Sequence, residues 1–510
     1  MATKGFLGID AGTQGLSIIF TDENLQVLAV GEGEYDMIPG MDEGCYEQNP
    51  ADWDQAMMDA MQRLRAALET KGIEMEIACI GISGQMHGEV LADENGQSLG
   101  PARLWCDARN DEEGHELTEL FGVKMPKRIT AARWLWTTRN RPEIAGKAKH
   151  MTTPSGWIAY RLTGEWNLGI GDAAGMFPID QQTLDYDVPL LNRFDEKYAG
   201  DFAPLKSLLP NVKKAGENAG QLTEAGSSLL GLPQGIPVAA AEGDQPAALA
   251  GSLIGKAGMV SVSFGPSVCA NSVGDRAFQG VSHAIDHFCA ADGKPINMVW
   301  LRNGTTYMNC LVEAIGMALP DGQNAFATIM PEVVNAAPDC GGIVALPFMD
   351  DEPGLEVERG GTACLIGLNP ANATPANMVK AALLASMFNL KIGSGILDEQ
   401  GFPRTELVLT GGLTKTPELG QVLADVFQTP VTLLDSADEG TAWGAALMAR
   451  YRFDSIEGAT TCWDEFLSSQ GTGDTTRFEP NSENANAYET VFAKYRKLLA
   501  AQPELNNAVS

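Results

Sequence analysis

The sequence predicts an α/β protein with two lobes, and three of its features lead to this prediction. Its 510 residues are too many for one hydrophobic core. Apolar strands alternate with helix-forming segments along the chain, which is typical of the α/β class. A strand followed by a glycine-containing turn begins each half, and this repetition indicates an ancient duplication. We expect the lobes to divide near residue 250.

The first half contains a meander of strands, a long helix and two buried strands. Apolar runs bounded by turn residues predict the strands. They are expected at residues 6–10, 16–20, 26–30, 77–82 and 235–241. Asn49 and Pro50 predict the start of the helix, because proline is favoured at the first helical position and apolar residues then recur at helical spacing through Lys71.

The second half continues the alternation. Strands are expected at residues 258–264, 268–271 and 405–409, and helices at 375–390, 416–427, 440–451 and 487–499. The stretch 468–486 is polar, and we expect it to be irregular. The expected domains are therefore 1–250, 251–455 and a C-terminal segment, 456–510.

The charge and the cysteines exclude several classes of protein. Thirty-five Lys and Arg against 66 Asp and Glu give a formal charge of −31, which disfavours nucleic acid and anionic membranes as partners. No apolar run reaches the roughly 18 residues of a membrane helix. The nine cysteines are scattered without a Cys-x-x-Cys pair, so we expect free thiols and a cytoplasmic location.

Three glycine-containing turns are suited to hold the phosphates of a nucleotide. In Asp10-Ala11-Gly12-Thr13, backbone N–H groups can surround phosphate while the carboxylate faces a metal ion. The other two are Gly265-Pro266-Ser267 and Gly411-Gly412. One such turn often arises without function, and the presence of three favours a nucleotide site. The chain has no Gly-x4-Gly-Lys-Ser/Thr loop, which excludes a P-loop enzyme.

Asp244 follows the predicted strand 235–241 and has two interpretations. A carboxylate at such a strand end can accept the proton of an attacking hydroxyl. It can equally cap a helix that begins at Gln245. The two roles are compatible.

Two other groups of polar residues are suited to a small polar ligand. His87 lies in a polar run after the strand 77–82, a common ligand position in α/β sheets, although a lone histidine is more often structural. Trp105, Asp107 and Arg109 offer an aromatic face, a carboxylate and a guanidinium that suit a polyol. The alternative for these three is a surface loop with one ion pair.

His283 and His287, with Asp286 and Cys289, have the residue types of a metal site. The two histidines would share a face only if the segment were helical. The neighbouring residues fit a turn and a strand better, so we predict no metal site there.

Taken together, these motifs resemble the FGGY family of carbohydrate kinases over nearly the whole chain. The motifs are, in order, residues 8–13, 85–88, 104–109, 162–165, 172–175, 243–244 and 411–412. The run 85–88 is the most specific and is similar to that of members acting on D-xylulose. The resemblance implies an actin-like ATPase (ribonuclease H-like) fold, two lobes with a central cleft, and phosphorylation of a ketopentose by ATP with Mg²⁺.

The resemblance also implies roles for individual residues. Asp244 is expected to be the catalytic base, and Asp10 is expected to take part in catalysis by holding Mg²⁺ through water. The expected sugar-binding residues are Gln85, Met86, His87, Trp105, Asp107, Asp244 and Gln245. The expected ATP-binding residues are Gly12, Thr13, Gly265, Ser267, Gly304, Gly411, Gly412 and Thr416.

The departures from the family pattern lie on or near the nucleotide side. Pro266 replaces a threonine, which removes a hydroxyl and a backbone donor. Ser17 replaces a basic residue, residues 352–356 replace an Arg-x-x-Pro segment, and Leu384 stands at an acidic position. Weak ATP affinity, another phosphoryl donor, another ketose, polyol or sugar acid, and a sugar-sensing relic therefore stay open. The resemblance also leaves a homodimer open.

Overall fold

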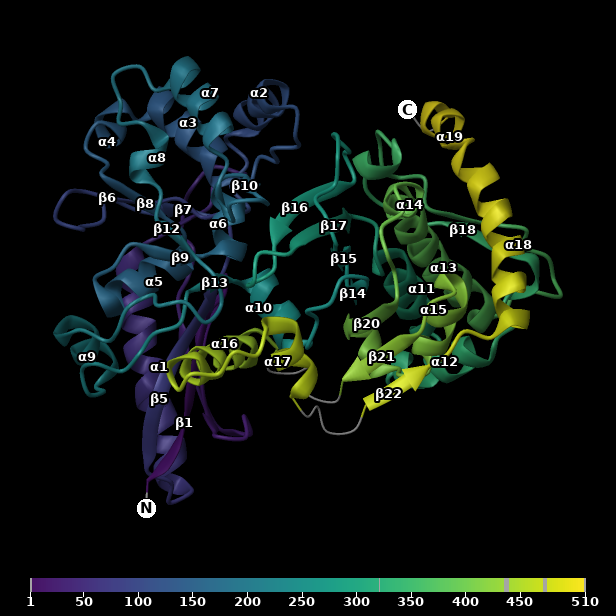
Figure 1. Ribbon diagram of the computed structural model, residues 1–510. Helices are drawn as coiled ribbons and strands as arrows, with labels where there is room; N and C mark the ends of the chain where they lie inside the picture. Colours follow the sequence, from purple (N-terminus) through teal and green to yellow (C-terminus); the bar gives the residue numbers. More distant parts are fainter. Residues whose placement is uncertain (1, 321, 435–439, 471–474, 509–510) are drawn as a thin grey trace. The chain divides into compact units, whose positions relative to one another are not determined.

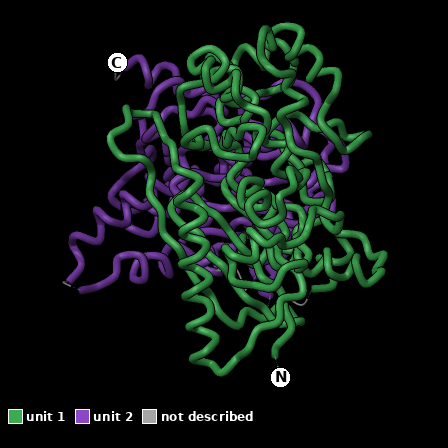
Figure 2. Tube along the Cα trace, turned by 90° about the vertical axis from the view of Figure 1, so that its left-hand side faces the viewer, with its two compact units in different colours: residues 1–255, 287–296, 438–471 green, residues 256–286, 297–437, 472–510 purple. Residues whose placement is uncertain are grey.

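The computed structural model describes residues 2–320, 322–434, 440–470 and 475–508 (Figure 1). The chain forms two compact units, each discontinuous in sequence (Figure 2). Unit 1 comprises residues 1–255, 287–296 and 438–471, and unit 2 comprises residues 256–286, 297–437 and 472–510. The sequence had instead suggested contiguous domains. Residues 440–455, expected in the C-terminal lobe, belong to unit 1.

Unit 1 is built on a five-stranded sheet of order β13-β5-β1-β2-β3. Its strands are β1 (Thr3–Ala11), β2 (Gly15–Asp22), β3 (Val27–Glu34), β5 (Met75–Gly84) and β13 (Glu242–Gly243). β1, β2 and β3 form the expected antiparallel meander, whereas β5 and β13 continue the sheet in parallel with β1.

Both faces of this sheet are covered by helices. Side chains alternate along a strand, so Leu7 and Ile9 face the core under α1 (Pro50–Thr70), while Phe6 belongs to the core under α16 (Gly440–Ile456). α16 approaches the sheet closely because two strand residues lack side chains. A Cβ at Gly8 would lie 2.1 Å from the carbonyl oxygen of Ala442, and one at Gly81 1.8 Å from that of Ala445. The N-terminal end of α16 is thereby fixed against β1 and β5.

A second group of helices in unit 1 has its own core, which includes Trp134 and Phe177. These helices are α2 (Asp111–Phe121), α3 (Thr130–Asn140), α6 (Ile170–Met176) and α7 (Val188–Tyr198). The smaller elements of unit 1 are β4 (Glu47–Gln48), β6 (Val90–Ala92), β7 (Ala102–Arg103), α4 (Pro142–Ala145), β8 (His150–Thr152), α5 (Pro154–Thr163), β9 (Asn167–Gly169), β10 (Ile179–Asp180), β11 (Asp185–Tyr186), α8 (Leu205–Leu208), β12 (Asn211–Lys213), α9 (Glu224–Leu230), α10 (Asp244–Gly251) and α17 (Trp463–Ser469).

Unit 2 is organised around a seven-stranded sheet of order β16-β17-β15-β14-β20-β21-β22. The strands are β14 (Met259–Phe264), β15 (Val268–Val273), β16 (Ile285–Cys289), β17 (Pro295–Leu301), β20 (Glu406–Gly411), β21 (Val431–Leu434) and β22 (Thr475–Phe478). Its larger helices are α11 (Thr306–Gly316), α12 (Ala325–Asn335), α13 (Pro375–Gly393), α15 (Leu419–Phe427) and α18 (Ser482–Leu499). The smaller elements are β18 (Val344–Leu346), β19 (Cys364–Ile366), α14 (Gly395–Glu399), α19 (Gln502–Ala508) and three 3₁₀ turns, Cys340–Gly342, Pro353–Leu355 and Gly412–Lys415.

The two sheets share part of their topology, which supports the duplication inferred from the sequence. In unit 2, β14 pairs antiparallel with β15 and parallel with β20, and β21 continues in parallel. In unit 1, β1 pairs in the same way with β2 and β5, and β13 continues in parallel.

Three expectations about elements need correction. Most of residues 235–241 are buried, but the segment pairs only as isolated bridges at Pro237 and Val238, because proline has no N–H for a ladder. The stretch 468–486, of which 471–474 lie outside the described residues, contains β22 and the start of α18, where the Asn481 side chain accepts hydrogen bonds from the first helical N–H groups. The helix expected from residue 416 begins at Leu419.

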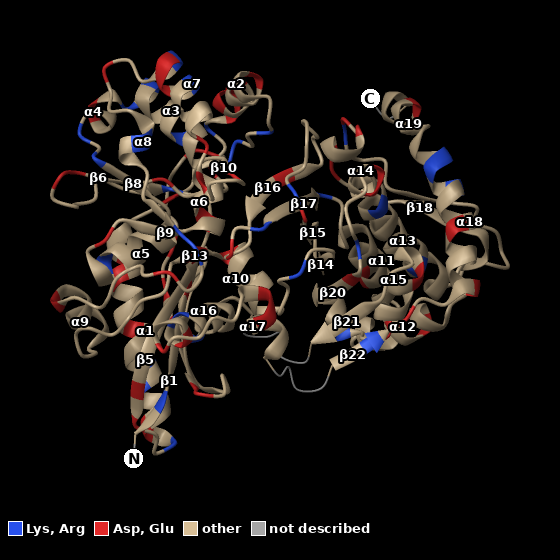
Figure 3. Ribbon diagram, viewed as in Figure 1, with Lys and Arg blue, Asp and Glu red and all other residues tan. Residues whose placement is uncertain are grey.

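The charged side chains are distributed over both units. Asp and Glu occur on elements throughout the chain, with Lys and Arg between them (Figure 3). Within the described ranges, no helix is both long enough and apolar enough to cross a membrane.

Candidate active site

The candidate site of unit 1 lies at the carboxyl ends of three parallel strands. Asp10 of β1 is in register with Ser83 of β5, and the next pair is Ala11 with Gly84. Gly243 of β13 is in register with Gly84, and Asp244 follows it as the first residue of α10. The sheet therefore places two predicted catalytic carboxylates, from positions far apart in the sequence, at one edge.

The carboxylate of Asp10 is held by two hydroxyl groups. Ser83 donates to Oδ1 at 2.5 Å, and Thr441, near the start of α16, donates to Oδ2 at 2.6 Å. Burial raises the pKa of Asp10 above its ordinary value, and these two hydrogen bonds act in the opposite direction. Sequence reasoning did not identify Ser83 or Thr441 as partners of Asp10.

Asp244 has the environment of a general base that works near neutral pH. Burial raises its pKa to about 7, and the charges of Asp10 and Asp172 add to the effect. A group with this pKa is largely ionised slightly above pH 7, yet it binds a proton strongly enough to remove one from an alcohol during attack. Asp244 is itself the first residue of α10, and Gly243 is the N-cap, so the alternative interpretation of Asp244 as the cap of a helix beginning at Gln245 is wrong by one position. The role of general base stays a prediction.

Two further buried carboxyl groups lie close to Asp244. Oδ2 of Asp172 accepts hydrogen bonds from Thr153 at 2.5 Å and Ser155 at 2.6 Å. The carboxyl group of Glu242 accepts from the backbone N–H of Asp172 at 2.9 Å. Burial raises the pKa of Asp172 to about 7 and that of Glu242 to about 8. Asp172 lay in a recognised motif without an assigned role, and Glu242 gave no signal beyond its position next to Gly243-Asp244.

Met86 and His87 lie beside this carboxyl cluster. A Cβ built at Gly243 would lie 2.2 Å from Cγ of Met86, and one at Gly175 would lie 2.9 Å from Nδ1 of His87, so both glycines make room for the two side chains. Nδ1 of His87 is 2.9 Å from the carbonyl oxygen of Gly175. Because a carbonyl only accepts, this contact assigns the proton to Nδ1 and makes Nε2 the acceptor of the ring.

The backbone of His87 also has an unusual conformation. Its φ of 63° is in the left-handed region, which costs a residue other than glycine about 1–3 kcal/mol. Such strain is most often retained where it aims a functional side chain, and this supports the predicted role of His87.

Trp105 and Asp107 differ in what they contact. Trp105 is 44% exposed, and its Nε1 donates to the hydroxyl of Thr13 at 3.0 Å. Asp107 is fully buried, and its carboxylate accepts hydrogen bonds from the backbone of Tyr46 and from the guanidinium of Arg109. Asp107 thus holds the loop 104–109 in shape, while Trp105 reaches the first phosphate turn.

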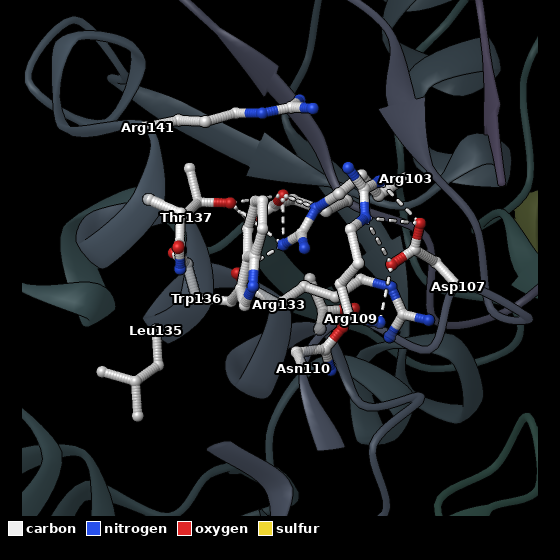
Figure 4. Close-up of polar contacts among 12 residues, drawn as sticks. Arg103, Asp107, Arg109, Asn110, Arg133, Leu135, Trp136, Thr137 and Arg141 are labelled. Atoms are coloured by element: carbon white, nitrogen blue, oxygen red, sulfur yellow. Dashed lines mark hydrogen bonds and ion pairs between the residues drawn. The ribbon is translucent and has the colours of Figure 1, made fainter. Parts of the chain in front are cut away.

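Arg109 of this loop and three other arginines, Arg103, Arg133 and Arg141, form a cluster around Trp136 (Figure 4). The guanidinium carbons of Arg103, Arg109 and Arg141 lie 4.4, 5.1 and 5.6 Å from the ring centre of Trp136. Arg133 donates from Nε to the carbonyl oxygen of Leu104 at 3.1 Å, directly before Trp105 in the chain. Three of the arginines are neutralised by buried carboxylates: Arg103 by Glu89, Arg109 by Asp107 and Glu47, and Arg141 by Glu47. The cluster therefore holds the loop 104–109 in position through contacts with Leu104 and Asp107.

The first of the three predicted phosphate-binding turns, which begins at Asp10, is held by hydrogen bonds within the turn and from nearby side chains. The N–H of Gly12 donates to the carbonyl oxygen of Gly15 at 2.9 Å, and the Tyr35 hydroxyl donates to the carbonyl oxygens of Gly12 at 2.6 Å and Gly15 at 3.0 Å. Nε2 of Gln48 donates to the carbonyl oxygen of Thr13 at 2.7 Å.

In unit 2, the predicted nucleotide residues gather at the carboxyl ends of β14 and β20. Gly411 is in register with Phe264, and the N–H of Gly304 donates to the carbonyl oxygen of Pro266 at 2.8 Å. Pro266 has no N–H, and that of Gly265 bonds to the carbonyl oxygen of Ser267. The donors that remain in this turn for a phosphate are therefore the N–H and the hydroxyl of Ser267. Gly412 follows Gly411 in the next turn, which ends at Thr416.

The residues around Asp10 fit a magnesium ion that is bound mainly by water and phosphate. An open pocket here is lined by Asp10, Gly15, Leu16, Ser17, Glu32, Gly33 and Glu34. It has three carboxylates and no cation, so a polyphosphate needs a divalent ion to approach it. No cluster of three or more metal-binding side chains occurs among the residues with a described placement. Mg²⁺ typically uses only one or two carboxylates together with substrate phosphates, which agrees with this arrangement.

The chain is similar in sequence to several known proteins. The family model described as "FGGY family of carbohydrate kinases, N-terminal domain" matches residues 6–251, and its C-terminal counterpart matches residues 321–453. The xylulose kinase of Haemophilus influenzae is 25% identical over 505 residues, which cover 96% of this chain and 98% of that one.

Solved structures have the same fold. The xylulose kinase of Rhodospirillum rubrum superposes with a TM-score of 0.82 at 21% identity, covering 98% of this chain and 99% of that one. The glycerol kinase of Plasmodium falciparum with ADP gives a TM-score of 0.78 at 19% identity and 98% coverage of both chains. The prediction of an actin-like ATPase fold is confirmed. On the match of both family models, the chain belongs to the FGGY family of carbohydrate kinases, which are phosphotransferases with an alcohol group as acceptor.

Proposed function

We propose that this protein transfers the γ-phosphoryl group of ATP to the terminal hydroxyl of D-xylulose, with Asp244 as the general base. The observation that carries the proposal is the register of β1, β5 and β13. It sets Asp10, the run that contains His87, and Asp244 at one edge of one sheet. The similarity to xylulose kinases over nearly the full chain supports the choice of sugar.

Each proposed sugar contact has a chemical basis. Nε2 of His87 accepts a hydrogen bond from a sugar hydroxyl, because Nδ1 is engaged with Gly175. Met86, which packs against Gly243, and Gln245, which follows Asp244 in α10, are also proposed to contact the sugar. Asp244 takes the proton of the terminal hydroxyl as it attacks. Trp105 covers the sugar, while Asp107 acts through the loop that carries Trp105.

The nucleotide is proposed to be bound by backbone groups and through Mg²⁺. Thr13 and Gly12 face its terminal phosphate, and Asp10 holds the ion through water. The ion, when bound, neutralises charge on the phosphates. The remaining contacts are proposed for Gly265, Ser267, Gly304, Gly411, Gly412 and Thr416.

An ADP-release assay over a panel of ketoses, polyols and sugar acids tests this proposal. D-xylulose should give the highest kcat/KM, because each hydroxyl that an analogue lacks leaves a buried protein group unpaired at a cost of about 1–3 kcal/mol. Mass spectrometry of the product should locate the phosphate on the terminal carbon. Equal turnover of D-xylulose and glycerol would contradict the sugar assignment, and no turnover of any sugar would contradict the proposed activity.

A further inference from the structure

A chain of two buried side-chain amides joins the sugar-side run to the first phosphate turn. Gln85 directly precedes Met86 and His87, and its Nε2 donates to Oε1 of Gln48 at 2.9 Å. Nε2 of Gln48 in turn donates to the carbonyl oxygen of Thr13 at 2.7 Å. Gln48 is 0% exposed and Gln85 1% exposed, so water does not compete for these hydrogen bonds.

The chemistry of the end groups sets the direction of this chain. The indole Nε1 of Trp53, which can only donate, lies 3.1 Å from Oε1 of Gln48. The Thr13 carbonyl oxygen at the other end of the amide can only accept. Both contacts require the same orientation of the Gln48 amide, and Gln85 must then present its NH₂ group. A reversed amide would set donor against donor at Trp53 and acceptor against acceptor at Thr13.

Thr13 also accepts a hydrogen bond at its side-chain hydroxyl. Trp105, on the loop 104–109, donates to the Thr13 hydroxyl oxygen, so the hydroxyl hydrogen of Thr13 remains available to donate. At the other end of the chain, the buried Oε1 of Gln85 accepts no hydrogen bond from any residue that the structure describes. The chain therefore ends, on the sugar side, at an acceptor with unused capacity.

We propose that Gln48 is a positioning residue that couples occupancy of the sugar site to the geometry of the phosphate turn through the chain Gln85–Gln48–Thr13. The inference rests on the proposed function, because it takes the run 85–88 as sugar-binding and the turn at Thr13 as phosphate-binding. A sugar that contacts Gln85 holds Gln85, Gln48 and the Thr13 carbonyl more firmly in the arrangement that they already have. The phosphate turn is then more rigid when the acceptor sugar is present, which favours transfer of the phosphoryl group to the sugar over transfer to water.

Gln48→Glu tests this coupling selectively. The new carboxylate still accepts from Trp53 and Gln85 but has no N–H for Thr13. Trp53→Phe is the matched control, because it removes the other donor to the same oxygen and leaves the contact with Thr13 intact. Gln85→Met breaks the chain on the sugar side and serves if Gln48→Glu does not fold.

The measurement is the Kd of an unreactive ATP analogue with Mg²⁺, by titration calorimetry, without and with saturating D-xylulose. In the wild type, the sugar should tighten analogue binding at least about fivefold, the lower end of typical couplings. The factor should fall below about twofold in Gln48→Glu and Gln85→Met and persist in Trp53→Phe. Full coupling in Gln48→Glu, or no coupling in the wild type, overturns the inference.

Failure of the proposed function would be visible separately, because wild-type turnover of the sugar panel is measured without any variant. If no sugar is phosphorylated, the inference is judged from analogue binding alone. Gln48→Glu should then bind the analogue about tenfold more weakly than Trp53→Phe, the effect of losing one buried hydrogen bond. Equal affinities of these two variants would overturn it.

Discussion

Replacing Asp244 by asparagine should have opposite effects on activity and stability. Asp244→Asn keeps the shape of the side chain but cannot take the proton of the attacking hydroxyl, so kcat should fall by about 10²–10⁴. The sugar and the nucleotide should still bind, because the remaining contacts are unchanged. Near-normal turnover by a folded variant would remove Asp244 from the mechanism.

The magnitude of the stability effect follows from the pKa of Asp244. Its folded-state pKa of about 7, against an ordinary value of 3.8, means that the folded protein binds more protons than the unfolded chain between these two pH values. The free energy of unfolding therefore falls as the pH rises from about 3.8 to about 7, because the folded protein holds this proton more tightly than the unfolded chain does. At about 1.4 kcal/mol for each pKa unit, the ionised group lowers the free energy of unfolding by up to about 4 kcal/mol above pH 7.

Asparagine removes this penalty, so Asp244→Asn should be more stable than the wild type on the alkaline side. Thermal unfolding of both proteins without ligands, at about pH 5 and about pH 8, gives the comparison. The gain in Tm should be several degrees at the higher pH and less than half as large at the lower one, because at about pH 5 only about a third of the penalty has developed. Because both proteins carry the same other carboxyl groups, the difference reports Asp244 together with its interaction with Asp10 and Asp172. An equal Tm difference at both pH values would refute the assignment of a raised pKa.

Substitutions at three further positions test the site by steady-state kinetics. Thr441→Val removes one of the two hydroxyls on Asp10 and should lower kcat about tenfold, whereas Thr441→Ser should restore it. His87→Ala should raise the KM for D-xylulose at least about tenfold and change the KM for ATP less than about twofold. Ser17→Lys adds a cation to a pocket of carboxylates and should lower the KM for ATP, less so at high salt. A normal Thr441→Val enzyme, an unchanged sugar KM, or an ATP KM that does not fall would contradict the respective prediction.

Local sequence signals predicted the elements that depend on local interactions. The meander of β1, β2 and β3 and the helix α1 were expected because alternating apolar residues, turns and Asn49-Pro50 lie close together in the chain. Residues 235–241 were mispredicted because burial alone produced the apolar run, whereas Pro237 limits the pairing. β22 was missed because its four residues are mostly exposed and carry no apolar pattern.

Candidate residues could be selected from the sequence where neighbouring residues in the chain form the whole motif. Asp10 and Gly12 were selected as candidates because a strand that ends in a glycine-containing turn is a recognisable local unit. Gln48 was not found, because its importance lies in contacts with Thr13 and Gln85, and no spacing rule relates these three positions. Asp107 was found, but its burial and its hydrogen bonds with Arg109 give it a supporting position that the motif does not reveal.

Thr441 shows why the assignment of domains limited the prediction of the site. The helix at residue 440 was assigned to the C-terminal lobe because it follows that lobe in the chain, and this assignment placed Thr441 away from Asp10. Yet residues 442–449 of α16 are all buried, and a helix that is apolar on every side must be covered by more than one partner. In unit 1 those partners are the sheet, approached through Gly8 and Gly81, and α10. A helix this deeply enclosed holds its first turn rigidly, and the Thr441 hydroxyl is for that reason able to fix the carboxylate of Asp10.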